Sequence, residues 1–183
     1  MFLKKENHKI DLLKKNYEAR LLFNFDNNSG FLFFFGKKMN LILTNNSNQE
    51  IIIDSNSITM PLIEGYHNQV IFFYNYIIKK YYNFFNNLVF EILEQDFKYK
   101  KENLVFCLKF LKTKLGICYY QKNKIVLNVF LIHLNLTAIK FIITHEILHL
   151  KYHKHDQLFK KNLLKKFPLN YYNIKNILDK ISI

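Results

Sequence analysis

The chain has 183 residues, of which 50% are hydrophobic and 17% aromatic, so it is long enough to bury a sizeable core in one compact domain. Residues 1–15 carry charges where a signal peptide needs an apolar segment, and no stretch of about 20 residues is apolar throughout. These features argue against export and membrane spanning, and we expect a cytoplasmic protein.

The formal net charge is +13, and Arg20 is the only arginine among the 27 basic residues. Together with many Asn, Ile, Phe and Tyr residues and no Trp, this bias is typical of an AT-rich genome, in which lysine is the default exposed residue. The alternative is a dedicated surface for nucleic acid or another polyanion. The glycines are isolated from one another, so the sequence contains no Gly-rich phosphate loop.

Residues 1–67 are predicted to be rich in β-structure and to form the N-terminal part of the same domain. Short apolar or alternating runs are separated by turn-forming segments rich in Asn and Ser. The pattern predicts small antiparallel hairpins. The predicted strands are Phe31–Phe35, Met39–Thr44, Glu50–Asp54 and Ser57–Leu62.

Between His67 and Phe97 the hydrophobic period changes to that of a helix, with no Pro or Gly to interrupt it. The sequence therefore predicts one long helix that packs against the helix carrying the histidine motif described below. Its aromatic residues could be taken for a base-stacking platform. Their helical spacing favours a buried face instead.

Two further strands are predicted at Leu104–Leu111 and Lys124–Phe130. His133 follows in an apolar run, where a lone histidine is more often a structural residue than a ligand, and we exclude it from the site. Asn135 or Thr137 is predicted to cap the next helix.

The segment Thr144–Leu150 has the sequence T-H-E-I-L-H-L and contains the H-E-x-x-H pattern. Residues four apart on a helix lie one above the other, so His145 and His149 can bind one Zn²⁺. Glu146 lies on the same side and can take a proton from a zinc-bound water, whose pKa the metal lowers to about 7. The alternative is two ordinary histidines on an amphipathic helix.

The third ligand must come from the segment that follows, which offers His153 and His155. On an unbroken helix His155 would lie about 15 Å along the axis from His145, too far to share a metal. The helix must therefore end near Tyr152 for His155 to be the ligand, which we favour over His153. Cys118 as a fourth ligand is disfavoured because it would displace the water; Cys118 and Cys107 are expected to be free thiols. Downstream, Asp156 is predicted to cap a helix, and a last short helix is predicted at Tyr171–Ile181.

Three segments together resemble the YgjP-like zinc metallopeptidases, relatives of the SprT-like and Wss-type gluzincins. They are L-G-I-C at Leu115–Cys118, K-I-V-L-N at Lys124–Asn128, and T-H-E-I-L-H-L-K-Y-H-K-H-D-Q-L-F from Thr144. The resemblance covers about Tyr82–Phe167 well and the N-terminal third only loosely, through F-G-K-K at Phe35–Lys38. It implies His145, His149 and His155 as ligands and Glu146 as the catalytic base. Leu115 and Ile117 replace the family's Trp and Ser, and Asn135 stands where Pro is usual. These departures affect the lining of the cleft. In zincins an edge strand beside the zinc helix can hold an extended substrate, and the two strands predicted above are the candidates.

The sequence thus predicts an α+β, zincin-like fold: a small antiparallel β-sheet packed with a long helix and the H-E-x-x-H helix. Residues 1–67 form its β-rich N-terminal part, and residues 68–183 its metallopeptidase core. The predicted function is a Zn²⁺-dependent hydrolase, most simply a metallopeptidase with a peptide or protein substrate. One alternative is a metal-dependent hydrolase of nucleotide phosphoanhydrides. Another is a nucleic-acid-associated protein with a protease-like fold that uses its basic surface.

Overall fold

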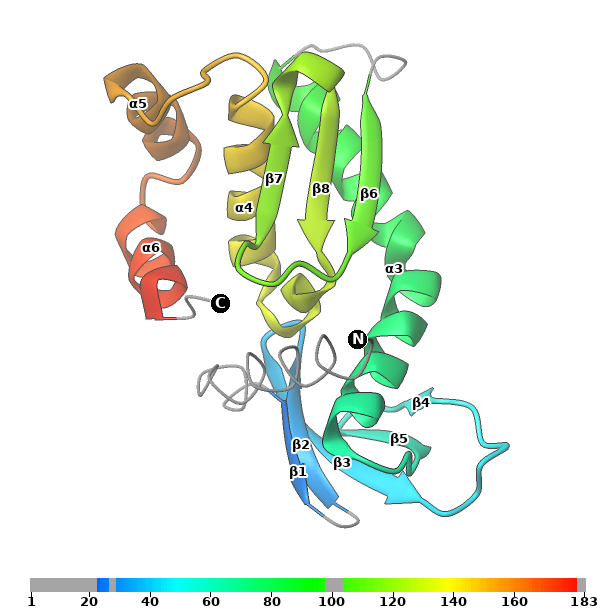
Figure 1. The fold of residues 1–183 in the computed structure, drawn as a ribbon. Coiled ribbons are helices and arrows are strands. Elements are labelled where there is room, and N and C mark those ends of the chain that lie inside the picture. Colours follow the sequence, from blue (N-terminus) through cyan, green and yellow to red (C-terminus); the bar gives the residue numbers. More distant parts are fainter. Residues whose placement is uncertain (1–22, 27–28, 98–103, 181–183) are drawn as a thin grey trace, which may run out of the picture.

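Two small β-sheets are bridged by one long helix (Figure 1). The structure is a computed structural model, and it describes residues 23–26, 29–97 and 104–180. Buried residues from both sheets and from the helices form one contiguous hydrophobic cluster. The fold is therefore of the mixed α+β class that the sequence predicts. Among the described residues, no helix combines the length and apolar character needed to cross a membrane.

The N-terminal sheet has five strands in the order β1-β2-β3-β5-β4. Along β3, Met39, Leu41 and Leu43 are buried and alternate with exposed residues, as expected of a strand with one face on the core. The strands are β1 (Phe23–Asp26), β2 (Ser29–Phe34), β3 (Lys37–Thr44), β4 (Ile52–Ile53) and β5 (Ser57–Pro61).

The prediction of antiparallel hairpins alone is wrong for this sheet, because β3 and β5 pair in parallel. The chain leaves β3 and first forms β4, a short strand at the edge of the sheet. β5 then runs antiparallel to β4 and occupies the position between β4 and β3. The β1 strand, which pairs with β2, was not predicted.

The second sheet has three strands in the order β6-β8-β7. They are β6 (Val105–Lys109), β7 (Gly116–Tyr119) and β8 (Lys124–Asn128). The predicted antiparallel sheet is wrong here too, since β6 and β8 are parallel and only β7 and β8 are antiparallel. The chain reaches β8 from β6 through β7, which forms an antiparallel hairpin with β8. β6 pairs with the other side of β8 and runs parallel to it. The predicted extension of β8 to Phe130 is replaced by the 3-10 helix η3 (Val129–His133), which begins where the Asn128 side chain accepts a hydrogen bond from the Phe130 N–H.

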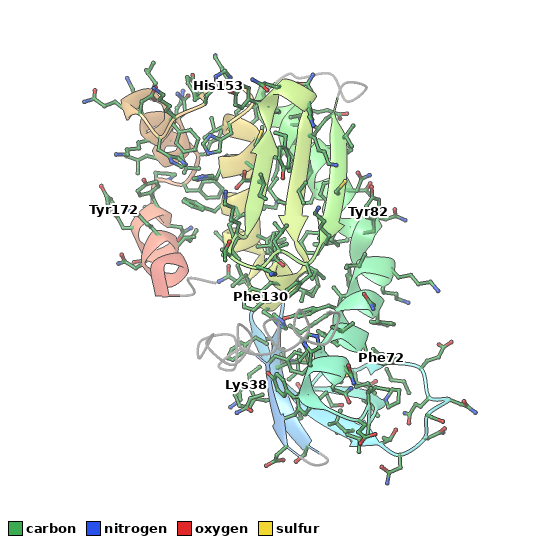
Figure 2. All side chains as sticks on the ribbon, in the orientation of Figure 1. Lys38, Phe72, Tyr82, Phe130, His153 and Tyr172 are labelled. Atoms are coloured by element: carbon green, nitrogen blue, oxygen red, sulfur yellow. The ribbon has the colours of Figure 1, made fainter. Side chains whose placement is uncertain are left out.

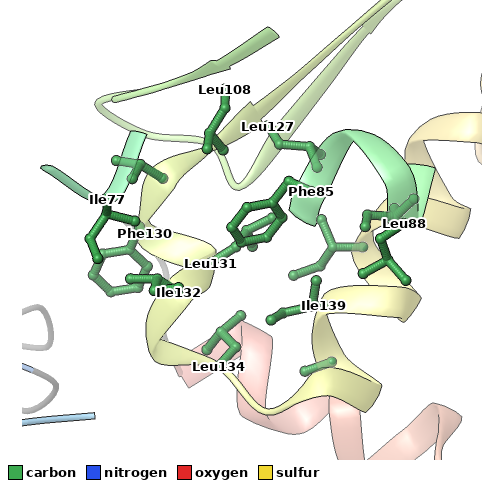
Figure 3. Packing of buried hydrophobic residues seen from close by; sticks show 14 of the residues in the cluster. Ile77, Phe85, Leu88, Leu108, Leu127, Phe130, Leu131, Ile132, Leu134 and Ile139 are labelled. Atoms are coloured by element: carbon green, nitrogen blue, oxygen red, sulfur yellow. The ribbon is translucent and has the colours of Figure 1, made fainter. Parts of the chain in front are cut away.

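The long helix α3 (Tyr66–Phe97) confirms the helix predicted from His67. Its first turns contact the N-terminal sheet, where the Phe73 ring meets the Phe23 ring at 5.1 Å. Further along, the Tyr82 hydroxyl donates to the Phe106 carbonyl at 3.3 Å in β6. Phe85 is fully buried among residues of β8, η3 and the following helix (Figure 3). One helix thus supports both sheets.

Three helices complete the fold: α4 (Leu136–Leu148), α5 (Gln157–Lys166) and α6 (Tyr171–Lys180). The predicted contact between the long helix and the motif-bearing helix α4 is confirmed. In Figure 1, α5 and α6 lie on the side of α4 away from α3. The last residue of the predicted C-terminal helix, Ile181, lies outside the described residues.

The turn between β2 and β3 docks on the start of α4. Phe35 and Gly36 both have positive φ, 49° and 79°, as a tight hairpin turn requires. The Phe35 N–H donates to the Ile132 carbonyl at 2.7 Å. A Cβ atom on Gly36 would lie 2.7 Å from the Cβ of Asn135, which leaves no space for a side chain. Asn135, one of the two predicted caps, accepts a hydrogen bond from the Ala138 N–H at 2.9 Å. The N-terminal sheet therefore fixes the end of α4 that is remote from the histidines.

Candidate metal centre

The helix that carries the histidine motif ends as the sequence requires. The last residue of α4 is Leu148, and His149 is its C-terminal cap. The chain then turns, with the Tyr152 N–H donating to the Leu148 carbonyl at 2.8 Å. Asp156 caps α5 by accepting from the Phe159 N–H at 2.8 Å, which confirms the predicted cap. The short segment between the two helices, residues 149–156, is called the ligand loop below.

The ligand loop brings three imidazoles together. The Nε2 atom of His155 lies 2.9 Å from Nε2 of His145 and 3.0 Å from Nε2 of His149. Their ligand atoms form the one group of three or more candidate metal ligands found among the described residues, all within 4.8 Å of one another. Nitrogen atoms bound at 2.0–2.1 Å to one tetrahedral zinc ion lie about 3.3 Å apart. The three histidines therefore fit the donor set of a zinc site with only a small expansion.

The orientation and protonation of the rings also suit a metal. The Nδ1–H of His149 faces the Tyr152 carbonyl oxygen at 2.9 Å, and donating to it leaves a lone pair on Nε2. Burial, together with the nearby His149 and His155, lowers the pKa of His145 to about 3, so this imidazole is neutral at physiological pH. Burial also lowers the pKa of His149. Neutral imidazoles are the form that binds a metal.

Phe159 provides a rigid apolar support for the cluster. Its ring is 1% exposed and lies in the first turns of α5. The ring centroid is 4.9 Å from that of His145, 4.7 Å from His149 and 4.8 Å from His155. One aromatic side chain therefore contacts all three imidazoles and limits their rotation.

Glu146 projects from α4 toward strand β7. It is 7% exposed, and burial raises the pKa of its carboxyl to about 7, although Lys114 and a hydrogen bond from the Cys118 N–H act in the opposite direction. A Cβ atom on Gly116 would lie 2.6 Å from Cγ of Glu146 and 2.8 Å from Oε1. Only glycine at position 116 lets the strand approach the carboxylate this closely. A carboxyl group with a pKa near 7 is suited to taking and returning a proton at neutral pH.

Comparison with known protein families identifies the family of the chain. The family model described as YgjP-like, metallopeptidase domain, matches residues 1–181 of the chain. The chain belongs to the YgjP-like metallopeptidase family. The resemblance found in the sequence is thereby confirmed, and it extends over the β-rich N-terminal part as well as the core.

Two solved structures are similar to part of this YgjP-like chain. The zymogen of the metallopeptidase jannalysin from Methanocaldococcus jannaschii is 22% identical, with a TM-score of 0.46 over 53% of this chain and 96% of that one. The zymogen of abylysin from Pyrococcus abyssi is 23% identical, with a TM-score of 0.45 over 53% of this chain and 90% of that one. Comparison with curated proteins gives no match.

The histidines that sequence reasoning left out of the site lie outside the cluster. His153, which is labelled in Figure 2, is exposed. Its ring stacks on Tyr120 with centroids 3.8 Å apart. His133 has a protein partner at each nitrogen: Nδ1 faces the Phe33 carbonyl at 2.6 Å, and Nε2 faces the Tyr74 hydroxyl at 2.9 Å. The structural role predicted for His133 is confirmed. Cys118 and Cys107 are free, as predicted, and burial raises the pKa of the Cys118 thiol to about 12.

The prediction of the edge strand was wrong. Of the two candidates, β8 is the central strand of the sheet, and β6 lies at the edge that contacts α3. The edge strand beside α4 is β7, in the interval that was predicted to lie between strands. The overlooked signal was Gly116 followed by Ile117 and Cys118, a short apolar run with a glycine where another group approaches closely.

Asn128 is a further residue whose contribution only the structure reveals. Its side chain is fully buried and donates to the Leu111 carbonyl at 2.9 Å and to the Lys114 carbonyl at 2.8 Å. Its backbone N–H donates to the Leu115 carbonyl at 2.9 Å. These bonds fix the segment that leads into Gly116, and through it the position of β7 against Glu146.

Proposed function

We propose that this protein is a zinc-dependent peptidase in which His145, His149 and His155 hold the metal and Glu146 is the catalytic base. The observation that carries the proposal is the convergence of three imidazole Nε2 atoms beside a buried carboxyl with a raised pKa. Membership of a metallopeptidase family supports the same reaction class.

In the proposed reaction, Glu146 accepts a proton from the attacking water and returns it to the leaving amine. A zinc ion bound by the three histidines would supply Lewis acidity, which polarises the scissile carbonyl and lowers the pKa of water. The Cys118 N–H and the close backbone of Gly116 hold the carboxylate in place during both proton transfers. The ligand loop is attached to α5 through the Asp156 cap, which holds His155 beside His145 and His149, where it would bind the metal.

Strand β7 is the proposed docking edge for the substrate. Within the described residues it pairs with β8 on one side, and its other edge has no strand partner. An extended peptide can add to such an edge through backbone hydrogen bonds. Because β7 also contacts α4 and approaches Glu146, a peptide bound there would pass beside the base.

The test uses the full chain loaded with zinc, the Glu146→Gln variant, and Glu94→Gln as a control at an exposed carboxylate of α3. We expect about one zinc per chain in all three proteins. Cleavage of an unfolded protein such as casein should fall at least about a hundredfold in Glu146→Gln only. Each protein is also offered nucleoside triphosphates. Glu146-dependent release of phosphate without proteolysis would replace the peptidase with a nucleotide hydrolase.

A further inference from the structure

The positive charge of the chain is concentrated in the half that contains the histidine cluster. Residues 104–183 hold 14 lysines and 3 acidic residues, whereas residues 1–103 hold 13 basic and 11 acidic residues. The two parts therefore carry net charges of +11 and +2. A genome-wide preference for lysine would enrich both parts alike, so it does not account for the missing acidic residues of the second.

Of the three acidic residues in this part of the chain, Asp156 is the one exposed carboxylate on the segments around the cluster. Between Glu102 and Glu146 the sequence has six lysines and no Asp or Glu. Glu146 itself is buried at the site, and Asp156 is used as the N-cap of α5. The other exposed charged residues on the segments that surround the cluster, residues 110–123 and 149–156, are lysines.

Five exposed lysines lie on the segments that border the site, and we call them the rim lysines: Lys112, Lys114, Lys122, Lys151 and Lys154. The first two precede β7, on the segment that Asn128 holds through the carbonyls of Leu111 and Lys114. Lys122 follows β7 in the 3-10 helix η2 (Tyr120–Lys122). The last two are on the ligand loop.

At the C-terminal end of β7, the segment that carries Lys122 contacts the ligand loop that carries Lys154. The ring of Tyr120, at the start of η2, stacks on His153 of the ligand loop at 3.8 Å. This contact brings the backbone near Lys122 close to the backbone near Lys154. Lysines therefore border β7 at both of its ends. In the ligand loop, Lys151 lies two residues after His149, and Lys154 directly precedes His155.

We infer that the rim lysines select acidic polypeptide segments, so that the preferred substrate carries Asp or Glu on both sides of the cleaved bond. The inference rests on the proposed peptidase function. The four residues of β7 span about 10 Å, so acidic residues about two to four positions from the cleaved bond would reach the lysines at either end. Complementary charge of this kind raises the association rate and sets specificity.

A polypeptide fits this surface better than a nucleic acid. The free edge of β7 offers backbone donors and acceptors in the repeat of a peptide strand, which a sugar–phosphate chain does not match. One face of the Tyr120 ring is covered by His153 and is not open for stacking on a base. Residues 104–183 contain 14 lysines and no arginine, the residue that binds phosphate in bidentate fashion.

The test measures binding separately from cleavage. Zinc-loaded Glu146→Gln protein is titrated with three labelled peptides that share one apolar centre and differ only in Glu, Ser or Lys flanks, at about 50 and 300 mM salt. We expect the Glu-flanked peptide to bind about tenfold tighter than the Ser-flanked one at low salt, with the difference shrinking at high salt. Equal affinity for the Glu-flanked and Ser-flanked peptides would overturn the inference.

Two double variants test whether the rim lysines are the residues that produce the preference for Glu-flanked peptides. Lys122→Gln/Lys154→Gln in this protein should lose most of the preference for Glu flanks while zinc content stays unchanged. Lys79→Gln/Lys80→Gln removes the same charge from exposed positions on α3 and should keep the preference. Equal losses in both variants would show that only net charge matters and would overturn the role of the rim.

Two further readouts separate the inference from its alternatives. A single-stranded DNA of similar charge that binds tighter than the acidic peptide and displaces it would assign the surface to nucleic acid. Selective binding of the Glu-flanked peptide, with no cleavage by the wild-type protein, would support the rim and count against the peptidase function. Cleavage of all three peptides with equal kcat/KM and equal affinity would support the peptidase function and overturn the role of the rim lysines.

Discussion

The histidine cluster is partly exposed, with His155 at the surface, whereas His133 is 1% exposed, and the two places also differ in the partners of their ring nitrogens. At His133 each ring nitrogen faces a protein atom, the Phe33 carbonyl on one side and the Tyr74 hydroxyl on the other. At the cluster the Nε2 atoms of His145 and His149 face only His155. The first arrangement is complete within the protein, and the second leaves lone pairs directed at a common point.

The pKa values alone do not distinguish these two places. Burial lowers the pKa of His133 to about 4 and that of His145 to about 3. What differs is the set of partners, since His133 joins β2, α3 and η3 whereas the cluster joins α4 to the ligand loop. A buried histidine thus becomes a candidate ligand when its lone pair lacks a protein donor, and burial by itself is not sufficient.

The largest expected effect is a difference in zinc affinity between variants of two histidines in the ligand loop. His155→Ala should weaken zinc binding by about a thousandfold, because it removes one of the three donors. His153→Ala should leave zinc affinity within about tenfold of wild type, since His153 contacts Tyr120 and lies outside the cluster. Competition with a chromogenic chelator measures both. The reverse order would identify His153 as the third ligand.

A second effect of comparable size concerns His133 and stability. Its pKa is about 4 in the folded protein and about 6.5 when unfolded, so below pH 6.5 the unfolded chain binds a proton that the folded protein does not. The free energy of unfolding is therefore unaffected by His133 protonation above pH 6.5. It falls by about 3 kcal/mol as the pH is lowered from 6.5 to 4. Urea unfolding across this range should show a smaller pH dependence for His133→Gln than for wild type. Zinc release at low pH affects both proteins equally. If wild type and His133→Gln lose the same stability between pH 7 and pH 4, this role of His133 is refuted.

The third effect tests how Glu146 is positioned. Gly116→Ala places a methyl group where the Glu146 side chain now lies, so we expect kcat to fall by about a hundredfold while zinc content is retained. Gly65→Ala is the matched control. Gly65 has a positive φ of 85°, and a Cβ atom there would make an ordinary contact of 3.6 Å with Nδ2 of Asn68, so the change should lower stability by about 1 kcal/mol without affecting kcat. Wild-type activity in Gly116→Ala would mean that the carboxylate does not depend on this close approach.

Much of the core fold was predictable from local patterns. Helical periodicity identified α3, and the capping residues Asn135 and Asp156 marked the starts of α4 and α5. The distance argument along the helix axis required α4 to end near Tyr152 if His155 is a ligand, and the helix ends at Leu148. Each of these features depends on residues close together in sequence, which is why the sequence alone reveals them.

The sheets were predicted less well, because strand pairing depends on residues far apart in the chain. Nothing local in β5 shows that it joins β3 in parallel, or that β8 lies between β6 and β7. The identity of the edge strand beside α4 follows from that order and was therefore missed.

The sequence by itself determined the chemistry available at the site: two histidines four residues apart, the glutamate between them, and a third histidine within reach if the helix ends. The tertiary structure decided which atoms meet. It brought Gly116 and the Cys118 N–H to Glu146, placed Phe159 beneath the three imidazoles and gave both nitrogens of His133 a protein partner. These contacts join segments distant in sequence, and only the packing of strands and helices around one core fixes them.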